Sequence, residues 1–251
     1  MLDNPILKAM MNRKSIRKYT DQVPSDEVIE TIVRAGQQAP FASQMCSLML
    51  SRDRENIPWE APISFLVCVD SHKLELIMAK RGWKLITNDL FLLLLGFQDA
   101  TLMGENMVMA AESLGLGSCY IGMIPYEAES LAKKYKLPNR VFPLVELVMG
   151  YPDESPPPRP RYPLDFVLFE NEYPEFSDKR IERAMKVMDD GYMAQDYYRD
   201  GDLMLKLKGD REETFTFDTY GWTEHISRKW GQWLESLDKM KKKFTQRGFK
   251  I

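Results

Sequence analysis

A short basic stretch near the N-terminus holds the residues with the clearest potential for chemistry. Residues 13–19 read RKSIRKY, which places four cations and a hydroxyl within six positions. The stretch follows one predicted helix and precedes the next. Guanidinium groups beside a hydroxyl and free backbone N–H groups match a phosphate ester, whereas an arbitrary basic run is more often a solvated surface. Both interpretations are open from this stretch alone.

The remaining chemistry-bearing residues are few, and this excludes several classes of site. There are two histidines and three cysteines, and no CxxC pair, so no set of metal ligands stands out. The nucleophile motif GxSxG and the nucleotide motifs GxxxxGK[ST] and GxGxxG do not occur. Acid–base or metal chemistry carried by the protein itself is therefore poorly supported. If the chain is an enzyme, a bound cofactor is expected to carry the reaction.

Composition and charge place the chain among globular proteins. Its 251 residues suit one domain with additions, and the net charge of -3 gives no signal for nucleic acid or an anionic membrane. The longest apolar run, Leu90–Phe97, is far shorter than the roughly 20 residues that span a bilayer. The N-terminus lacks a secretory-signal pattern, and three widely spaced cysteines favour a reduced compartment. A cytoplasmic location is the resulting expectation.

Hydrophobic periodicity, caps and breakers predict the elements that must position these residues. Helices are predicted over 4–11, 24–39, 71–82, 88–115, 126–136 and 177–193, with a last helix from Thr223 to about Phe244. Strands are predicted at 48–50, 63–69, 118–123, 142–149 and 164–170. A proline-rich segment over 152–163 is predicted to be extended, and residues 196–222 to be irregular. The lysines of 239–243 are interpreted as a solvated helix end rather than a nucleic-acid patch.

Four separated motifs occur in a fixed order along the chain. They are RKSIRKY, AGQQAPFASQ, AAESLGLGSCYIG, and LVMGYPDE followed by PRPRYPLDFV. Together they resemble the FMN-dependent nitroreductase family, and most closely its larger NAD(P)H flavin reductase/nitroreductase branch. The resemblance runs from about residue 5 to 195, and the end of the last helix is also similar to that branch. It implies an α+β fold with a mixed sheet sandwiched between helices, and an intertwined homodimer with FMN at the interface.

The resemblance also implies the residues that bind FMN. Arg13, Ser15 and Arg17, with Lys14 as an additional contact, would hold the phosphate and the ribityl chain. Arg159 and Arg161 would close on the same phosphate. The loop of Pro40, Phe41, Ala42, Ser43 and Gln44 would pass the edge of the isoalloxazine ring. Tyr120, Ile121, Gly122 and Met123 would lie along the other face, with a backbone N–H directed at flavin N5. No protein side chain is implied as a catalytic acid or base.

The function implied is that of an FMN-dependent oxidoreductase. It would take a hydride from NAD(P)H and pass electrons to a small organic acceptor, such as a nitro compound, a quinone or a flavin, by a ping-pong mechanism. Phe41, Cys46 and Met123 depart from the family pattern, and they leave an alternative open: a flavin-binding or flavin-storage protein without efficient turnover. Residues 1–195 are expected to form the FMN-binding domain, and residues 196–251 an extension that packs on it.

Overall fold

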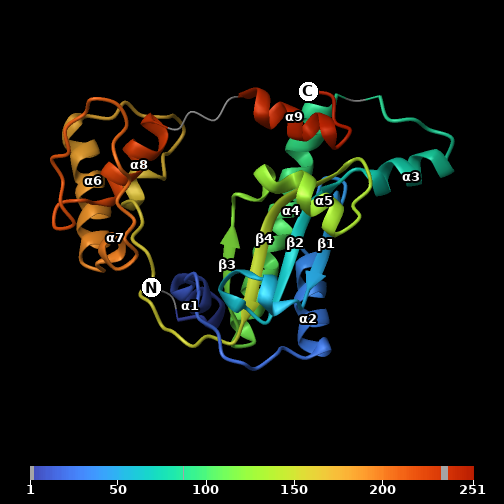
Figure 1. The fold of residues 1–251 in the computed structure, drawn as a ribbon, viewed down its shortest axis with the longest axis horizontal. Helices are drawn as coiled ribbons and strands as arrows, with labels where there is room; N and C mark the ends of the chain where they lie inside the picture. The colour runs from blue at the N-terminus through green and yellow to red at the C-terminus, as the bar shows by residue number, and fades with distance from the viewer. Residues whose placement is uncertain (1–2, 87, 233–236) are drawn as a thin grey trace. The chain divides into compact units, whose positions relative to one another are not determined.

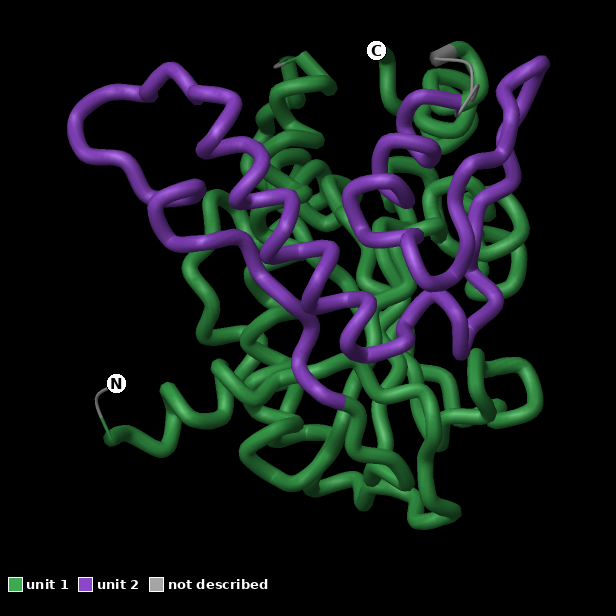
Figure 2. Tube along the Cα trace, turned by 90° about the vertical axis from the view of Figure 1, so that its left-hand side faces the viewer, with its two compact units in different colours: residues 1–156, 236–251 green, residues 157–235 purple. Residues whose placement is uncertain are grey.

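The computed structural model describes residues 3–86, 88–232 and 237–251. The chain divides into two compact units. Unit 1 comprises residues 1–156 and 236–251, and unit 2 comprises residues 157–235, as the two colours of Figure 2 show. The four motifs fall in unit 1, apart from the PRPRYPLDFV segment, which begins unit 2.

Unit 1 is built on a four-stranded sheet (Figure 1). Its strands lie in the order β1 (Cys46–Ser51), β2 (Ile63–Asp70), β4 (Val141–Gly150) and β3 (Gly117–Ile121). Every pair of named strands is antiparallel, with Leu48 opposite Val67 and Tyr120 opposite Leu147. Within the described ranges, parallel pairing is limited to one isolated bridge, between Ser15 and Ser118. The predicted α+β class is confirmed, whereas the sheet predicted to be mixed is antiparallel in every pair of its named strands.

Helices cover both faces of the sheet, as predicted. Strand β2 is buried along its whole length, so its two faces can be followed residue by residue. Phe65, Val67 and Val69 belong to the main core with α2 (Asp26–Gln37) and α4 (Asp89–Ser113). The alternate residues Leu66 and Cys68 belong to a second cluster with η3 (Ile124–Glu127) and α5 (Ala128–Lys134). Because neither face of β2 meets water, apolar residues can occupy successive positions of the strand instead of every second one.

Two helices of unit 1 begin at asparagine caps. Asn4 Oδ1 accepts the N–H of Ile6 at 2.9 Å and starts α1 (Pro5–Asn12). Asn88 Oδ1 accepts the N–H of Phe91 at 2.7 Å and starts α4, whose apolar sides explain its place in the core. The remaining helical elements are α3 (His72–Lys80), η1 (Arg54–Asn56) and η2 (Pro58–Glu60). No helix among the described residues is long and apolar enough to cross a membrane.

The C-terminal segment returns to unit 1. Phe244 in α9 (Leu237–Gln246) stacks on Phe142 with ring centroids 4.2 Å apart. The buried guanidinium of Arg247 donates to the carbonyls of Leu137 and Val141, at 2.9 and 3.1 Å. These contacts join the chain end to the start of β4.

Unit 2 is a helical unit with an internal ionic cluster. It contains η4 (Leu164–Phe166), α6 (Asp178–Met193), α7 (Tyr197–Asp200) and α8 (Trp222–Gly231). Asp189 in α6 accepts the N–H and the hydroxyl of Thr223 at 2.7 and 2.6 Å, which ties α6 to α8. Arg228 is 4% exposed and pairs with Glu213 and Glu224.

Two sequence predictions are wrong in this region. Residues 164–170 form no strand but the single turn η4, because Phe166, Phe169 and Phe176 pack ring on ring and Arg180 donates to the Asp165 carbonyl. The predicted last helix is not continuous, because Gln232 leaves helical conformation with φ −135° and ψ 10°. Helix α8 ends there and α9 begins at Leu237. Trp233 and Leu234, which the prediction placed on this helix, lie outside the described residues.

Candidate functional site

The basic stretch runs from the end of α1 along the free edge of β3. Ile16 donates its N–H to the carbonyl of Ser118 at 2.9 Å, and Tyr19 bridges to Pro152 further along. The stretch lies so close to β3 that a Cβ on Gly117 would be 2.4 Å from Ile16 Cγ1. Gly117 therefore serves close packing, and the backbone of the cationic residues is fixed on the sheet.

The residues that follow β4 also hold this stretch in place. Glu154 Oε1 accepts the backbone N–H groups of Arg17 at 2.5 Å and of Lys18 at 3.2 Å. Lys14 Nζ donates to Ser155 Oγ at 3.0 Å. The motif LVMGYPDE contains Glu154, but no local pattern connects its carboxylate with Arg17, which lies 137 positions earlier in the chain.

The guanidinium groups of the stretch have few protein partners. The Arg17 guanidinium carbon lies 5.4 Å from the centroid of the Trp59 ring. Within residues 3–86, 88–232 and 237–251, neither Arg13 nor Arg17 forms an ion pair with a carboxylate. Both side chains are half-buried. Within the described ranges no carboxylate is therefore in direct contact with either guanidinium, although the charge of Arg13 acts on the pKa of Glu112.

Arg159 and Arg161 belong to unit 2. Arg159 Nη1 donates to Gln195 Oε1 at 2.6 Å, and its guanidinium carbon lies 4.0 Å from the centroid of the Tyr197 ring. Gln195 in turn donates to the carbonyl of Pro158 at 3.0 Å. Arg161 Nη1 donates to the carbonyls of residues 159 and 160. These contacts hold the Arg159 guanidinium in one orientation. That Arg159 and the basic stretch bind the same phosphate stays a prediction.

A buried carboxylate on the central helix shapes the loop of residues 40–44. Asp99 is 3% exposed and accepts the N–H groups of Ala42, Ser43 and Met45 at 2.6, 3.0 and 2.9 Å. Gln44 takes a left-handed conformation, with φ +52°. Three hydrogen bonds to one carboxylate give this loop a defined shape. Sequence reasoning missed Asp99, whose only signal was an acid near the middle of a helix that is apolar on most faces.

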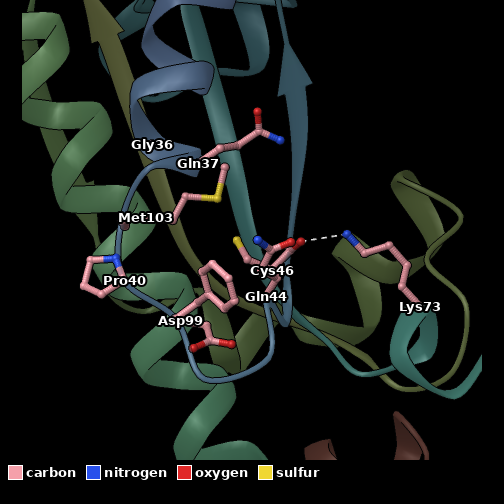
Figure 3. A pocket seen from close by; sticks show the side chains of 10 residues that line it. Gly36, Gln37, Pro40, Gln44, Cys46, Lys73, Asp99 and Met103 are labelled. Carbon is pink, nitrogen blue, oxygen red and sulfur yellow. Dashed lines mark hydrogen bonds between the residues drawn. The ribbon is translucent and has the colours of Figure 1, made fainter. Parts of the chain in front are cut away.

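This loop covers one side of a pocket of about 140 Å³ (Figure 3). Pro40, Phe41 and Gln44 of the predicted site line it. Its other lining residues come from α2, the turn after it, β1, α3 and α4: Gly36, Gln37, Ala39, Cys46, Lys73, Asp99 and Met103. Burial raises the pKa of the Cys46 thiol to about 12, so the thiol is neutral near pH 7 and is a poor nucleophile.

Tyr120 and its successors occupy the end of β3. The Tyr120 side chain turns to α4, where a Cβ on Gly104 would be 2.9 Å from its hydroxyl, and burial raises the pKa of that hydroxyl. Gly122 and Met123 are exposed, and no atom lies within 4 Å of a Cβ built on Gly122. The backbone at Gly122 and the Met123 side chain are thus accessible for a ligand.

The predicted site residues of unit 1 fall into two groups. The basic stretch and Tyr120–Met123 lie at the β3 edge of the sheet, whereas the loop of residues 40–44 leads into β1 at the opposite edge. Three strand spacings separate β1 from β3, about 14 Å. No cluster of His, Cys, Asp or Glu able to hold a metal occurs in the described part of the chain.

Comparison with known proteins identifies the family. A protein-family model described as "Nitroreductase family" matches residues 10–56 and 50–151 of this chain. The chain belongs to the nitroreductase family. It is 30% identical over 229 residues to "FMN reductase (NADPH)" of Bacillus subtilis, covering 85% of this chain and 89% of that relative. It is also 30% identical over 206 residues to "Oxygen-insensitive NADPH nitroreductase" of Salmonella typhimurium, covering 76% of this chain and 84% of that relative.

The fold of this nitroreductase-family chain is also similar to solved structures. The "Structure of B. megaterium NfrA2" superposes with a TM-score of 0.83 at 26% identity and covers 99% of both chains. The similarity extends over residues on both sides of the unit boundary. The family resemblance of the four motifs is therefore confirmed.

Proposed function

We propose that this protein is an FMN-dependent oxidoreductase that takes a hydride from NAD(P)H and passes electrons to a small organic acceptor. The names of its relatives, an NADPH-dependent FMN reductase and an NADPH nitroreductase, support this activity. They do not favour the alternative of a flavin-storage protein. The reaction alternates between the two substrates, which is a ping-pong scheme.

The observation that carries the proposal is the fixed cationic stretch on the β3 edge. A phosphate dianion needs several donors, and Arg13, Ser15 and Arg17 lie on a backbone held by β3 and Glu154. Lys14 adds a fourth donor. Arg159, oriented by Gln195 and Tyr197, would complete the phosphate site together with Arg161. These residues fit the phosphate end of FMN.

The other predicted contacts fit the ring of FMN. When bound, the isoalloxazine ring accepts a hydride and later gives it up. The loop of residues 40–44 holds a fixed shape on Asp99 and can contact the ring edge through Ser43 and Gln44. The open backbone at Gly122 and Met123 can donate a hydrogen bond to N5, where negative charge develops. The chain thus binds and orients the ring without supplying an acid or a base.

We further propose a homodimer in which each FMN lies between two copies. The two groups of site residues lie at opposite edges of one sheet, so a single copy does not bring them together. Helix α1 exposes Ile6, Met10 and Met11, and an apolar groove of about 660 Å³ lies between α1, α2 and α4. Exposed apolar side chains beside an apolar groove are features of an interaction surface, and a second copy is the occupant proposed.

The test of the proposal is spectroscopic. The purified protein should be yellow or should take up FMN in an absorbance titration, and NADPH or NADH should bleach the bound flavin in anaerobic stopped-flow mixing. Protein that binds no FMN would refute the proposed cofactor. Protein that binds FMN but is not bleached by either nucleotide would support the storage alternative. The division at residue 195 and the cytoplasmic location stay predictions.

A further inference from the structure

A turn with a strained backbone presents a tryptophan beside the basic stretch. Trp59 in η2 has φ +57° and ψ 23°, and the next residue, Glu60, has φ +50°. Among the residues that the structure describes, no other two successive residues share this left-handed conformation. The conformation costs free energy for any residue other than glycine, and most for bulky side chains. The rest of the fold must therefore hold this turn in place.

The turn is attached to the segment that carries the basic stretch. Ile57, at the start of the turn, is buried in the same core cluster as Ile16. Arg54 Nε donates to the carbonyl of Glu60 at 2.6 Å, and Arg54 Nη1 lies 2.8 Å from Asp21 Oδ1. The burial of Ile57 contributes most of this attachment, because an ion pair with an exposed carboxylate is weak in water.

The Trp59 ring lies against the side chain of Arg17. The guanidinium carbon is 5.4 Å from the ring centroid, within the separation of about 6 Å over which a cation is attracted to an aromatic face. The ring is 43% exposed, so burial in the core does not explain its place. Since Glu154 holds the backbone N–H of Arg17, the ring acts on the remaining freedom of the side chain.

We propose that Trp59 is a positioning residue that holds the Arg17 guanidinium in place for the phosphate of FMN. The inference rests on the proposed function and adds to it a residue outside the four motifs. An arginine side chain that is already restricted in the free protein loses less rotamer entropy when it binds phosphate. An aromatic ring attracts the cation but carries no negative charge, so it does not compete with the phosphate as a carboxylate would. The strained backbone is the local cost of placing the ring there.

The experiment measures the Kd for FMN in the wild type, in Trp59→Leu, in Arg17→Ala and in the variant with both changes. Leucine keeps apolar bulk but has no aromatic face, whereas Trp59→Phe keeps a ring. Trp83→Leu is the matched control, because Trp83 is also an exposed tryptophan of unit 1. Quenching of flavin fluorescence gives the affinities, and thermal melting checks that each variant is folded.

We expect Trp59→Leu to raise the Kd for FMN about three- to tenfold. Trp59→Phe should recover most of this loss, and Trp83→Leu should bind FMN like the wild type. In the Arg17→Ala background, Trp59→Leu should change the Kd by less than about twofold, because the ring then has no guanidinium to orient. A ring that only supported the fold would weaken FMN binding by the same factor in both backgrounds.

The strained backbone gives a second measurement that needs no flavin. Trp59→Gly and Trp59→Ala both remove the ring, but only glycine adopts φ +57° without strain. The urea midpoint of Trp59→Gly should therefore be higher than that of Trp59→Ala, although both variants should bind FMN more weakly than the wild type.

Three results would overturn the inference. They are equal Kd values for FMN in the wild type and Trp59→Leu, equal losses in both backgrounds, and a urea midpoint of Trp59→Gly at or below that of Trp59→Ala. Each of them leaves the proposed function standing, because the wild type would still bind FMN and be bleached by NADPH. A wild type that binds no FMN would refute the proposed function and this inference together.

Discussion

At the scale of single residues, the guanidinium of Arg17 is the group whose role is easiest to isolate. Its backbone N–H is bound by Glu154, whereas its guanidinium forms no hydrogen bond or ion pair within the described ranges and lies 5.4 Å from the centroid of the Trp59 ring. Removal of the side chain should therefore leave the fold intact and remove one charged hydrogen bond to phosphate, worth about 1.5–3 kcal/mol.

Arg17→Ala is expected to raise the Kd for FMN about 10- to 100-fold, with little change in melting temperature. Flavin fluorescence quenching measures the affinity. Lys18→Ala is the matched control, since Lys18 is the adjacent exposed cation whose backbone is held by the same carboxylate. Equal FMN affinity in the wild type and Arg17→Ala would place the phosphate elsewhere.

Asp99 is the residue on which the loop of residues 40–44 depends. Asp99→Asn replaces one acceptor oxygen with a donor, so at least one of the three buried backbone N–H groups loses its partner. We expect a loss of about 1–3 kcal/mol in the free energy of unfolding, measured by urea denaturation. Gln98→Ala, at the exposed neighbouring position of α4, should cost much less. Similar stabilities of the two variants would show that the loop does not need the carboxylate.

Local sequence patterns predicted the arginines of the basic stretch and the loop of residues 40–44. They did not predict the residues that hold these segments in place. The residue types of RKSIRKY and AGQQAPFASQ, and their similarity to family motifs, predicted a phosphate-binding stretch and a loop at the flavin ring. Asp99, Glu154 and Lys73 act through partners 54 to 57, 136 to 137 and 27 positions away, respectively. Those partners are set by tertiary packing, which no local pattern encodes.

At the scale of elements, the prediction succeeded where periodicity and caps agreed. Strands β1 to β4 and helices α1 to α6 lie within a few residues of their predicted bounds. The prediction of secondary structure failed where local composition favours one kind of element and tertiary packing produces another. Residues 164–170 have the aromatic and β-branched content of a strand, but their rings find partners within unit 2. The break at Gln232 could not be predicted, because the apolar residues of the sequence between 226 and 244 keep their spacing of three and four positions across it.

The ionic cluster of unit 2 gives a pH prediction for the segment that precedes α8. The guanidinium of Arg228 lowers the pKa of Glu213 from its usual 4.5 to about 2. A carboxyl whose pKa falls on folding stabilises the folded state fully above its unfolded pKa. That contribution is lost as the pH falls from 4.5 towards 2.

Urea denaturation of the wild type and Glu213→Gln, between pH 7 and pH 2.5, should therefore show a stability difference that is constant above about pH 5 and shrinks below it. Glu212→Gln, the adjacent exposed carboxylate, should give no such pH-dependent difference. A difference that stays the same down to pH 2.5 would mean that the pair does not control the stability of this segment.

At the scale of the whole molecule, the sheet itself argues for two copies around each flavin. The order β1-β2-β4-β3 places the loop of residues 40–44 and the basic stretch at opposite edges. In the proposed homodimer, a two-fold axis would bring the β3 edge of one copy to the loop of residues 40–44 of the other copy, and it would do so twice.

This arrangement can be tested by mixing two defective variants. Arg13→Ala/Arg17→Ala removes phosphate donors at one edge, and Ser43→Trp adds bulk to the exposed loop at the other. Each homodimer should bind FMN poorly at both sites. After the two variants are unfolded and refolded together, half of the dimers should be mixed, and each mixed dimer contains one intact site, so about one quarter of all sites should bind FMN with wild-type affinity. Equilibrium dialysis with FMN measures this fraction. If each site were built from one chain, mixing would restore nothing, because every chain would still carry its own defect.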